Sequence, residues 1–141
     1  MPRASLTRQV SFAAAHRYRR PEWSNEKNEE MFGLCSRESY HGHTYLCEVT
    51  VNGEIDAQTG FVVDLGHLDR ILAVEVKERF DHRNINVDIP EFADGKLIPS
   101  GENIARFIFQ RVSTKLSHSV RVTSVRIAED RSLSATYTGE E

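Results

Sequence analysis

The sequence has little of the chemistry that is typical of secreted or membrane proteins. It contains two cysteines in 141 residues, Cys35 and Cys47, whereas a small secreted scaffold usually carries more. No apolar run reaches the length of a membrane-spanning helix, and the first residues have no apolar run of signal-peptide length. We therefore expect a cytoplasmic protein in which both cysteines are reduced thiols.

An excess of positive charge is also absent. Lys and Arg number 18 against 21 Asp and Glu, which gives a net charge of -3, and domains that bind nucleic acid are usually basic. The hydrophobic content of 39% and the charged content of 28% are ordinary for a globular fold. We expect a single domain over residues 1–141, with its own core and no nucleic-acid or membrane partner.

Regular hydrophobic patterns are present in five segments. Alternation of apolar and polar residues predicts strands over residues 6–16 and 43–53 and a terminal hairpin over residues 120–139. Apolar residues at helical spacing predict one helix over residues 65–79 and another that begins after Ser100, a good N-cap. Four antiparallel strands with two helices between the pairs indicate an α+β layer.

Two other segments, residues 17–39 and 80–99, have no clear period. We expect both to be long loops, and long loops in small domains are often functional. The predicted sheet also has two open edges, which pairing between subunits could cover.

Histidines provide the first candidate site. His41 and His43 are two residues apart on a predicted strand, so their side chains point the same way. His16 ends the first strand and comes beside them if the two strands form a hairpin. Three histidines plus one open position is a common catalytic zinc set. The spacing leaves the metal open, because His-x-His also occurs by chance, and we expect His67 and His118 to be ordinary surface residues.

The cysteines differ in their surroundings. Cys47 lies on an apolar strand face and is expected to be a packed hydrophobe. Cys35 lies in a loop before His41 and could be a metal ligand, a nucleophile, a general base or inert. Asp81 followed by His82 could orient and relay a proton to Cys35, or could be a helix-terminal pair without chemistry.

Segments along nearly the whole chain then point to one family. In chain order they are FAAAHRY, SNEKNEEMFGLC, CSRESYHGHTY, GEIDAQTGFVVDLGHLDRIL, FDHRNIN, PSGENIA, VRIAED and YTGE. Together they resemble the 6-pyruvoyl-tetrahydropterin synthase family. The resemblance implies zinc ligands His16, His41 and His43, catalytic groups Cys35, Asp81 and His82 with Cys35 as the base, and substrate-binding groups Glu129, Ser100 and Glu102.

The resemblance also implies a fold and an assembly. The family has the tunnelling fold, a four-stranded antiparallel sheet with two helices on one face. Its trimers form barrels that stack into homohexamers, with active sites at subunit interfaces. Asp81 and His82 could therefore meet Cys35 from a neighbouring chain.

The implied activity is that of a carbon-oxygen lyase of tetrahydrobiopterin biosynthesis. It converts 7,8-dihydroneopterin triphosphate to 6-pyruvoyl-tetrahydropterin with loss of triphosphate, and requires no nicotinamide or flavin. Zinc would act as a Lewis acid on the side-chain oxygens, and a Cys35 thiolate would take a carbon-bound proton. Glu129 would accept hydrogen bonds from the pterin 2-amino group and ring N–H.

Several positions depart from the family pattern and keep alternatives open. The stretch 36–40 and the pairs Ser100-Gly101 and Asp130-Arg131 differ from the usual residues. One alternative is 6-carboxy-tetrahydropterin synthase of queuosine biosynthesis, but the five residues between Cys35 and His41 and the long preceding loop favour the pyruvoyl enzyme. Others are an aldolase-like pterin enzyme, against which Cys35 counts, and a non-catalytic zinc- or pterin-binding protein.

Overall fold

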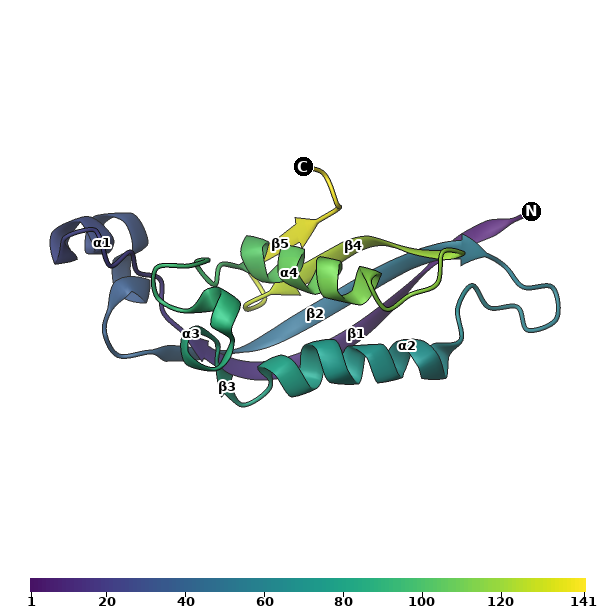
Figure 1. Ribbon diagram of the computed structural model, residues 1–141, viewed down its shortest axis with the longest axis horizontal. Coiled ribbons are helices and arrows are strands. Elements are labelled where there is room, and N and C mark those ends of the chain that lie inside the picture. Colours follow the sequence, from purple (N-terminus) through teal and green to yellow (C-terminus); the bar gives the residue numbers. More distant parts are fainter.

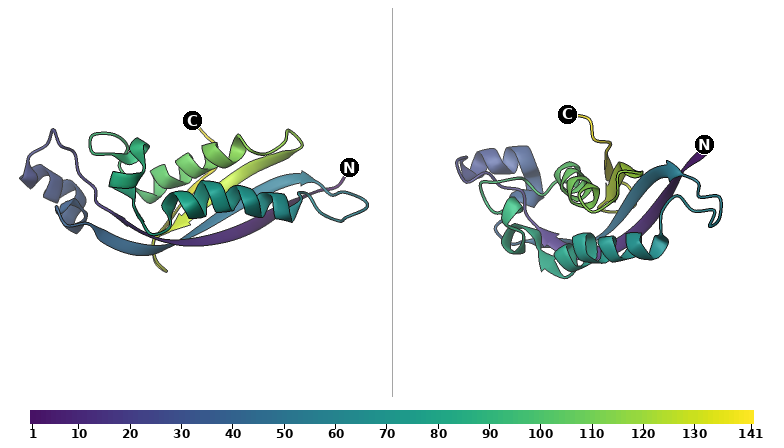
Figure 2. Two further views of the ribbon diagram at one scale, coloured as in Figure 1. Left: turned by 60° about the horizontal axis from the view of Figure 1, so that its bottom comes forward. Right: turned by 45° about the vertical axis from the view of Figure 1, so that its right-hand side comes forward.

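Five strands form one sheet, and the longer helices lie on one face of it (Figures 1 and 2). The computed structural model describes residues 1–141. The strands, in the spatial order β3-β1-β2-β4-β5, are β1 (Arg3–His16), β2 (His41–Glu54), β3 (Arg83–Asn84), β4 (Val120–Ala128) and β5 (Ser134–Tyr137). The helical segments are α1 (Asn25–Phe32), η1 (Gly33–Ser36), α2 (Leu65–Leu72), η2 (Ala73–Glu78), α3 (Ile85–Asp88), η3 (Pro90–Phe92) and α4 (Gly101–Ser113).

The long hairpin of β1 and β2 is the frame of the molecule. The two strands pair antiparallel from Arg3↔Glu54 to His16↔His41, so both predicted strands are confirmed and are slightly longer than expected. Alternation places Phe12 and Tyr45 on the same buried face, where their rings stack with centroids 4.9 Å apart. The residues that alternate with the buried ones along each strand point to the other face of the sheet, as in any β-strand.

The two predicted helices are present and cover the buried face. Asp64 caps α2 by accepting a hydrogen bond from the His67 N–H. The helix continues to Glu78, but its last part, η2, is a π-helix. Ser100 caps α4, accepting from the Asn103 N–H at 3.2 Å. The buried side chains of α4 (Ile104, Phe107, Ile108 and Val112) are those that the periodicity predicts.

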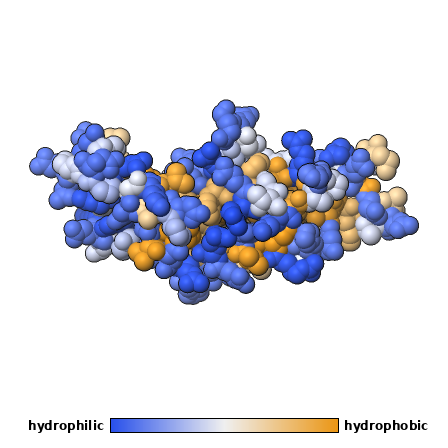
Figure 3. Space-filling model, in the orientation of Figure 1, coloured by the Kyte–Doolittle hydropathy of each residue, from blue (hydrophilic) through white to orange (hydrophobic).

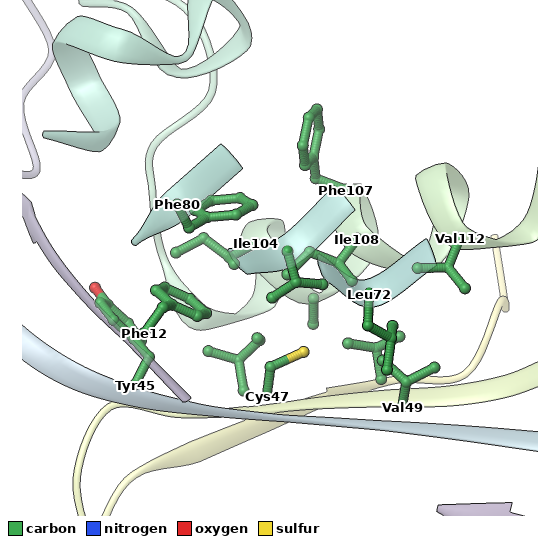
Figure 4. Packing of buried hydrophobic residues seen from close by; sticks show 14 of the residues in the cluster. Phe12, Tyr45, Cys47, Val49, Leu72, Phe80, Ile104, Phe107, Ile108 and Val112 are labelled. Atoms are coloured by element: carbon green, nitrogen blue, oxygen red, sulfur yellow. The ribbon is translucent and has the colours of Figure 1, made fainter. Parts of the chain in front are cut away.

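The core lies between these helices and the sheet, and its side chains interdigitate (Figure 4). Cys47 is fully buried in it, so its predicted role as a packed hydrophobe is confirmed. Burial raises the pKa of the Cys47 thiol to about 12. The surface seen in Figure 3 is largely hydrophilic with separate apolar areas, and no helix combines the length and apolarity needed to cross a membrane.

The two predicted loops contain regular structure, which corrects the sequence interpretation. The first holds α1, which begins after the N-cap Ser24. It escaped detection because it buries one residue, Asn28, and has no apolar stripe. The Asn28 amide instead bonds the main chain at Arg20, Trp23 and Ser24. The helix is therefore held by one polar side chain.

The second predicted loop adds a fifth strand to the four that we expected. β3 has two residues and runs parallel to the end of β1, with Ala14↔Arg83 and Ala15↔Asn84. A two-residue strand is too short to show alternation in the sequence. The turn before it has His82 at a φ of 58°, a conformation that non-glycine residues seldom adopt. The His82 N–H and the Ala13 carbonyl, 2.6 Å apart, hold this turn against β1.

Candidate metal and substrate site

Three histidines converge where β1 ends and β2 begins. His16 pairs with His41 in the antiparallel register, and His43 lies two residues further along β2. The Nε2 atoms of His16 and His41 are 3.1 Å apart. One ligand nitrogen from each of the three rings lies within 4.8 Å of the others. The hairpin thus brings together the three histidines that the sequence singled out.

The environment favours the neutral form of His16 and His41. Burial lowers the pKa of His16 to about 3, and the neighbouring His41 and His43 add to the shift. Burial also lowers the pKa of His41, with His43 contributing. Neutral imidazoles are the form that binds metals. The buried His43 Nε2 has no hydrogen-bond partner within the protein, so the residues fit a metal ion held by three nitrogen donors.

Tyr45 fixes the ring of His16 from the side opposite the cluster. Its hydroxyl lies 2.6 Å from His16 Nδ1, and both side chains are fully buried. With Nδ1 engaged, His16 presents Nε2 to the other two histidines, as metal ligands with an outer hydrogen-bond partner do. The sequence analysis did not select Tyr45. The available signal in the sequence is that Tyr45 follows His43 by two residues on β2, so the two side chains point to the same face.

A cavity of about 650 Å³ brings together four of the other predicted groups. Cys35, Ser100, Glu102 and Glu129 all line it. They come from η1, from the N-cap and first turn of α4 and from the residue after β4. Cys35 Sγ lies 3.6 Å from His41 Nε2. The cavity therefore joins a thiol and two carboxylates in one chain, and the thiol is its contact with the histidine cluster.

Within the protein itself, the Cys35 thiol is held in its neutral form. Burial raises its pKa most, and the Glu129 carboxylate adds to the rise. A cation beside a thiol acts in the opposite direction. A metal ion on the adjacent histidines would thus favour the thiolate that the predicted base requires.

Two of the three departures from the family pattern, Ser100-Gly101 and Asp130-Arg131, have defined structural roles near the cavity. Ser100 uses its hydroxyl as the cap of α4. A Cβ on Gly101 would lie 3.4 Å from the Ala135 Cβ, because the first turn of α4 packs closely on β5. Asp130 closes the β4–β5 turn, its Oδ1 accepting from the N–H groups of Ser132 and Leu133. This turn places Glu129 at the cavity.

Tyr18 is a second residue that the sequence analysis missed, and it lines the cavity. Its hydroxyl donates to Glu129 Oε1 at 2.7 Å. Tyr18 has the parity of His16 and follows it by two residues, which was the available signal. The contact between Tyr18 and Glu129 could not be predicted from the sequence, because the two residues are more than a hundred positions apart.

Asp81 and His82 lie apart from this cavity. Asp81 Oδ2 is 2.9 Å from His82 Nδ1, and hydrogen bonds from the Ala13 N–H and from His82 lower the pKa of Asp81. The His82 side chain is 85% exposed. His82 lines a different cavity, together with residues of β1 and β2 that include His43. One chain therefore does not bring this pair into contact with Cys35.

Known proteins share this sequence and fold over nearly the whole chain. The 6-pyruvoyl tetrahydrobiopterin synthase of Pongo abelii is 36% identical over 137 residues, covering 97% of this chain and 92% of that protein. A structure of Caenorhabditis elegans 6-pyruvoyl tetrahydropterin synthase matches with a TM-score of 0.91 at 32% identity, covering 99% of this chain and 98% of the other. A further relative, the dihydroneopterin monophosphate aldolase of Pyrococcus furiosus, is 33% identical over 127 residues, covering 90% of each.

The fold comparison confirms the expected α+β tunnelling fold for the single chain, with β3 as an addition to the four predicted strands. The protein-family model described as 6-pyruvoyl tetrahydropterin synthase matches residues 5–140. With both the sequence match and the fold extending over almost every residue, the chain belongs to the 6-pyruvoyl tetrahydropterin synthase family.

Proposed function

We propose that the protein is a zinc-dependent 6-pyruvoyl-tetrahydropterin synthase. It converts 7,8-dihydroneopterin triphosphate to 6-pyruvoyl-tetrahydropterin with elimination of triphosphate. The observation that carries the proposal is the position of Cys35, 3.6 Å from a histidine of the cluster and on the same cavity as Glu129. A heterocycle held by Glu129 would place its side chain next to the Cys35 thiol, beside the histidine cluster.

Each group has a distinct role in this proposal. Glu129 accepts hydrogen bonds from the 2-amino group and the ring N–H of the pterin. Cys35 removes and returns carbon-bound protons of the substrate side chain as a general base. His16, His41 and His43 would hold zinc, which when bound supplies a Lewis acid for the side-chain oxygens. Ser100 and Glu102 complete the wall on which the ring rests.

The position of the Asp81–His82 pair supports an assembly in which chains share sites. His82 is exposed and the pair is separate from Cys35, so it would assist a thiol of a neighbouring chain. Two sheet edges are free for such contacts, the outer edge of β5 and that of β1 before Ser11. We infer a homohexamer built from two trimer barrels, in the cytoplasm, where the two free thiols stay reduced.

A product assay tests the function. Purified protein is incubated with zinc and dihydroneopterin triphosphate, and triphosphate release and the pterin product are measured together. Release of triphosphate with a pyruvoyl product is expected. A carboxy product would replace the proposal with the queuosine enzyme, and cleavage of the side chain without triphosphate release would indicate an aldolase. If the protein binds pterin but turns over no substrate, it is a non-catalytic pterin-binding protein.

A further inference from the structure

Tyr18 contacts three parts of the site, two with its side chain and one with its main chain. Its ring packs on His16 with centroids 4.7 Å apart. Its hydroxyl donates to Glu129 Oε1 at 2.7 Å. Its main-chain N–H donates to the Cys35 carbonyl at 2.6 Å. A residue in this position links the metal cluster, the substrate carboxylate and the loop that carries the thiol.

The ring of Tyr18 has little freedom to leave this position. His16 packs on it, and Phe32, the last residue of α1, meets it edge-on with centroids 6.0 Å apart. The hydroxyl end is thereby aimed at Glu129. The contacts with His16 and Phe32 hold the ring in place. Removal of the hydroxyl alone, as in Tyr18→Phe, therefore leaves the ring position unchanged.

The hydrogen bond to Glu129 changes what that carboxylate can recognise. Glu129 follows the end of β4, and Tyr18 is its only side-chain hydrogen-bond partner in the protein. A carboxylate held at one oxygen keeps a fixed plane and still has lone pairs for a ligand. Two parallel N–H donors can then be accepted at a defined angle, whereas a carbonyl at the same place meets a fixed negative charge.

Tyr18 is the donor in this interaction. A phenol ordinarily has a pKa of about 10, so its proton stays in place at neutral pH, and the 2.7 Å contact with the Glu129 carboxylate is a charge-assisted hydrogen bond.

We propose that Tyr18 is a positioning residue that holds Glu129 in the orientation selecting a heterocycle with a 2-amino group beside a ring N–H. This inference rests on the proposed function, because Glu129 is taken as the pterin anchor. Tyr18 acts through Glu129 and not on the reacting atoms. Its loss should therefore affect recognition of the ring more than the chemical step.

The test is Tyr18→Phe, with Tyr137→Phe as the matched control. Tyr137 also donates its hydroxyl to a carboxylate, that of Glu141, but does not line the cavity. For both variants and the unchanged protein, KM and kcat are measured with dihydroneopterin triphosphate. Binding of pterin and of lumazine, which has a carbonyl in place of the 2-amino group, is measured in the same zinc-loaded samples, together with zinc content.

We expect Tyr18→Phe to raise KM about ten-fold and to reduce the preference for pterin over lumazine about ten-fold, the value of one hydrogen bond to a charged group. Zinc content and kcat should stay close to those of the control. An unchanged KM and an unchanged preference would overturn the proposal. So would a loss of kcat and zinc with the preference intact, because that result describes a purely structural residue.

The two proposals can fail separately. If the unchanged protein binds pterin but gives no pyruvoyl product, the proposed function fails. The comparison of pterin with lumazine still decides the role of Tyr18 in that case.

Discussion

Cys35 lies within contact distance of a predicted metal ligand, yet its position suits a base more than a ligand. The three histidine nitrogens already form a compact donor set, and a catalytic zinc keeps its fourth position open for substrate. The thiol lines the cavity beside Glu129. Removing the thiol should therefore separate metal binding from catalysis.

The first prediction concerns Cys35→Ala. We expect the variant to keep its zinc, measured by atomic emission on dialysed protein, and to lose at least about a hundred-fold in turnover, the usual contribution of a general base. Parallel loss of zinc would make Cys35 a metal ligand and remove the assigned role.

The second prediction concerns His41→Ala, with the exposed His118→Ala as control. We expect His41→Ala to bind zinc far more weakly, because two nitrogens remain of the three-histidine set. His118 lies outside the cluster and its variant should keep full occupancy. Full zinc occupancy in His41→Ala would rule out the three-histidine site.

The sequence could predict the groups that lie close together on one hairpin. Parity and strand pairing place His16 beside His41 and His43 without further information. Tyr18 and Glu129 come from segments more than a hundred residues apart, so their contact depends on how the β4–β5 turn meets the first long connection. The family resemblance supplied Glu129, whereas nothing supplied Tyr18.

Among the elements, η2 carries an ion pair that joins two helical segments. Glu75 is 2% exposed and pairs with Arg79 in its own helix at 3.1 Å and with Arg111 in α4 at 3.0 Å. Burial acts to raise the pKa of Glu75, but the hydrogen bonds and charges of Arg111 and Arg79 outweigh it, so the pKa lies below its ordinary value of 4.5. The contact between Glu75 and Arg111 fastens α4 to η2.

The third prediction follows from this depressed pKa. Glu75→Gln should destabilise the protein by about 2 kcal/mol at neutral pH, less than for fully buried pairs because both guanidiniums reach solvent. The stabilisation is present above the ordinary glutamate pKa and is lost as the pH falls through the lower folded value. The difference in Tm between the two proteins should therefore shrink in acid.

Thermal melts of both proteins from about pH 7 to about pH 2 measure this change. The exposed Glu78→Gln is the control and should show a small effect at every pH. A constant difference for Glu75→Gln would mean that packing, and not charge, accounts for the loss.

Elements with a buried stripe were predictable, and elements held by polar groups were not. The stripes of α2 and α4 and the alternation of β1 and β2 are visible in the sequence. The helix α1 is held by the amide of Asn28, and β3 by main-chain bonds beside His82. Hydrogen bonds of this kind leave no hydrophobic periodicity in the sequence, so pattern analysis cannot detect them.

At the scale of the whole molecule, the candidate groups divide between two separate places on one chain. Cys35 and Glu129 line one cavity, and His82 lines another. The sheet also leaves the outer edge of β5 unpaired, and most of the edge of β1 that faces away from β2. Natural proteins seldom leave such edges uncovered, and an assembly that covers them could also complete the site.

The fourth prediction is complementation between two inactive variants. Cys35→Ala and His82→Ala should each have little activity alone. When the two are unfolded, mixed equally and refolded, about a quarter of the sites should contain an intact thiol and an intact histidine, if the groups come from different chains. Activity is measured beside an unmixed refolded control. Absence of recovery would place both groups in the same chain.

Ala13 offers a way to observe the Asp81–His82 turn directly. Both main-chain polar groups of Ala13 are engaged by it, the N–H by Asp81 Oδ1 at 2.9 Å and the carbonyl by the His82 N–H at 2.6 Å. Amide protons of this kind exchange with solvent only when their segment opens. The exchange rate of this single proton therefore measures how firmly the turn is held against the strand that ends in His16.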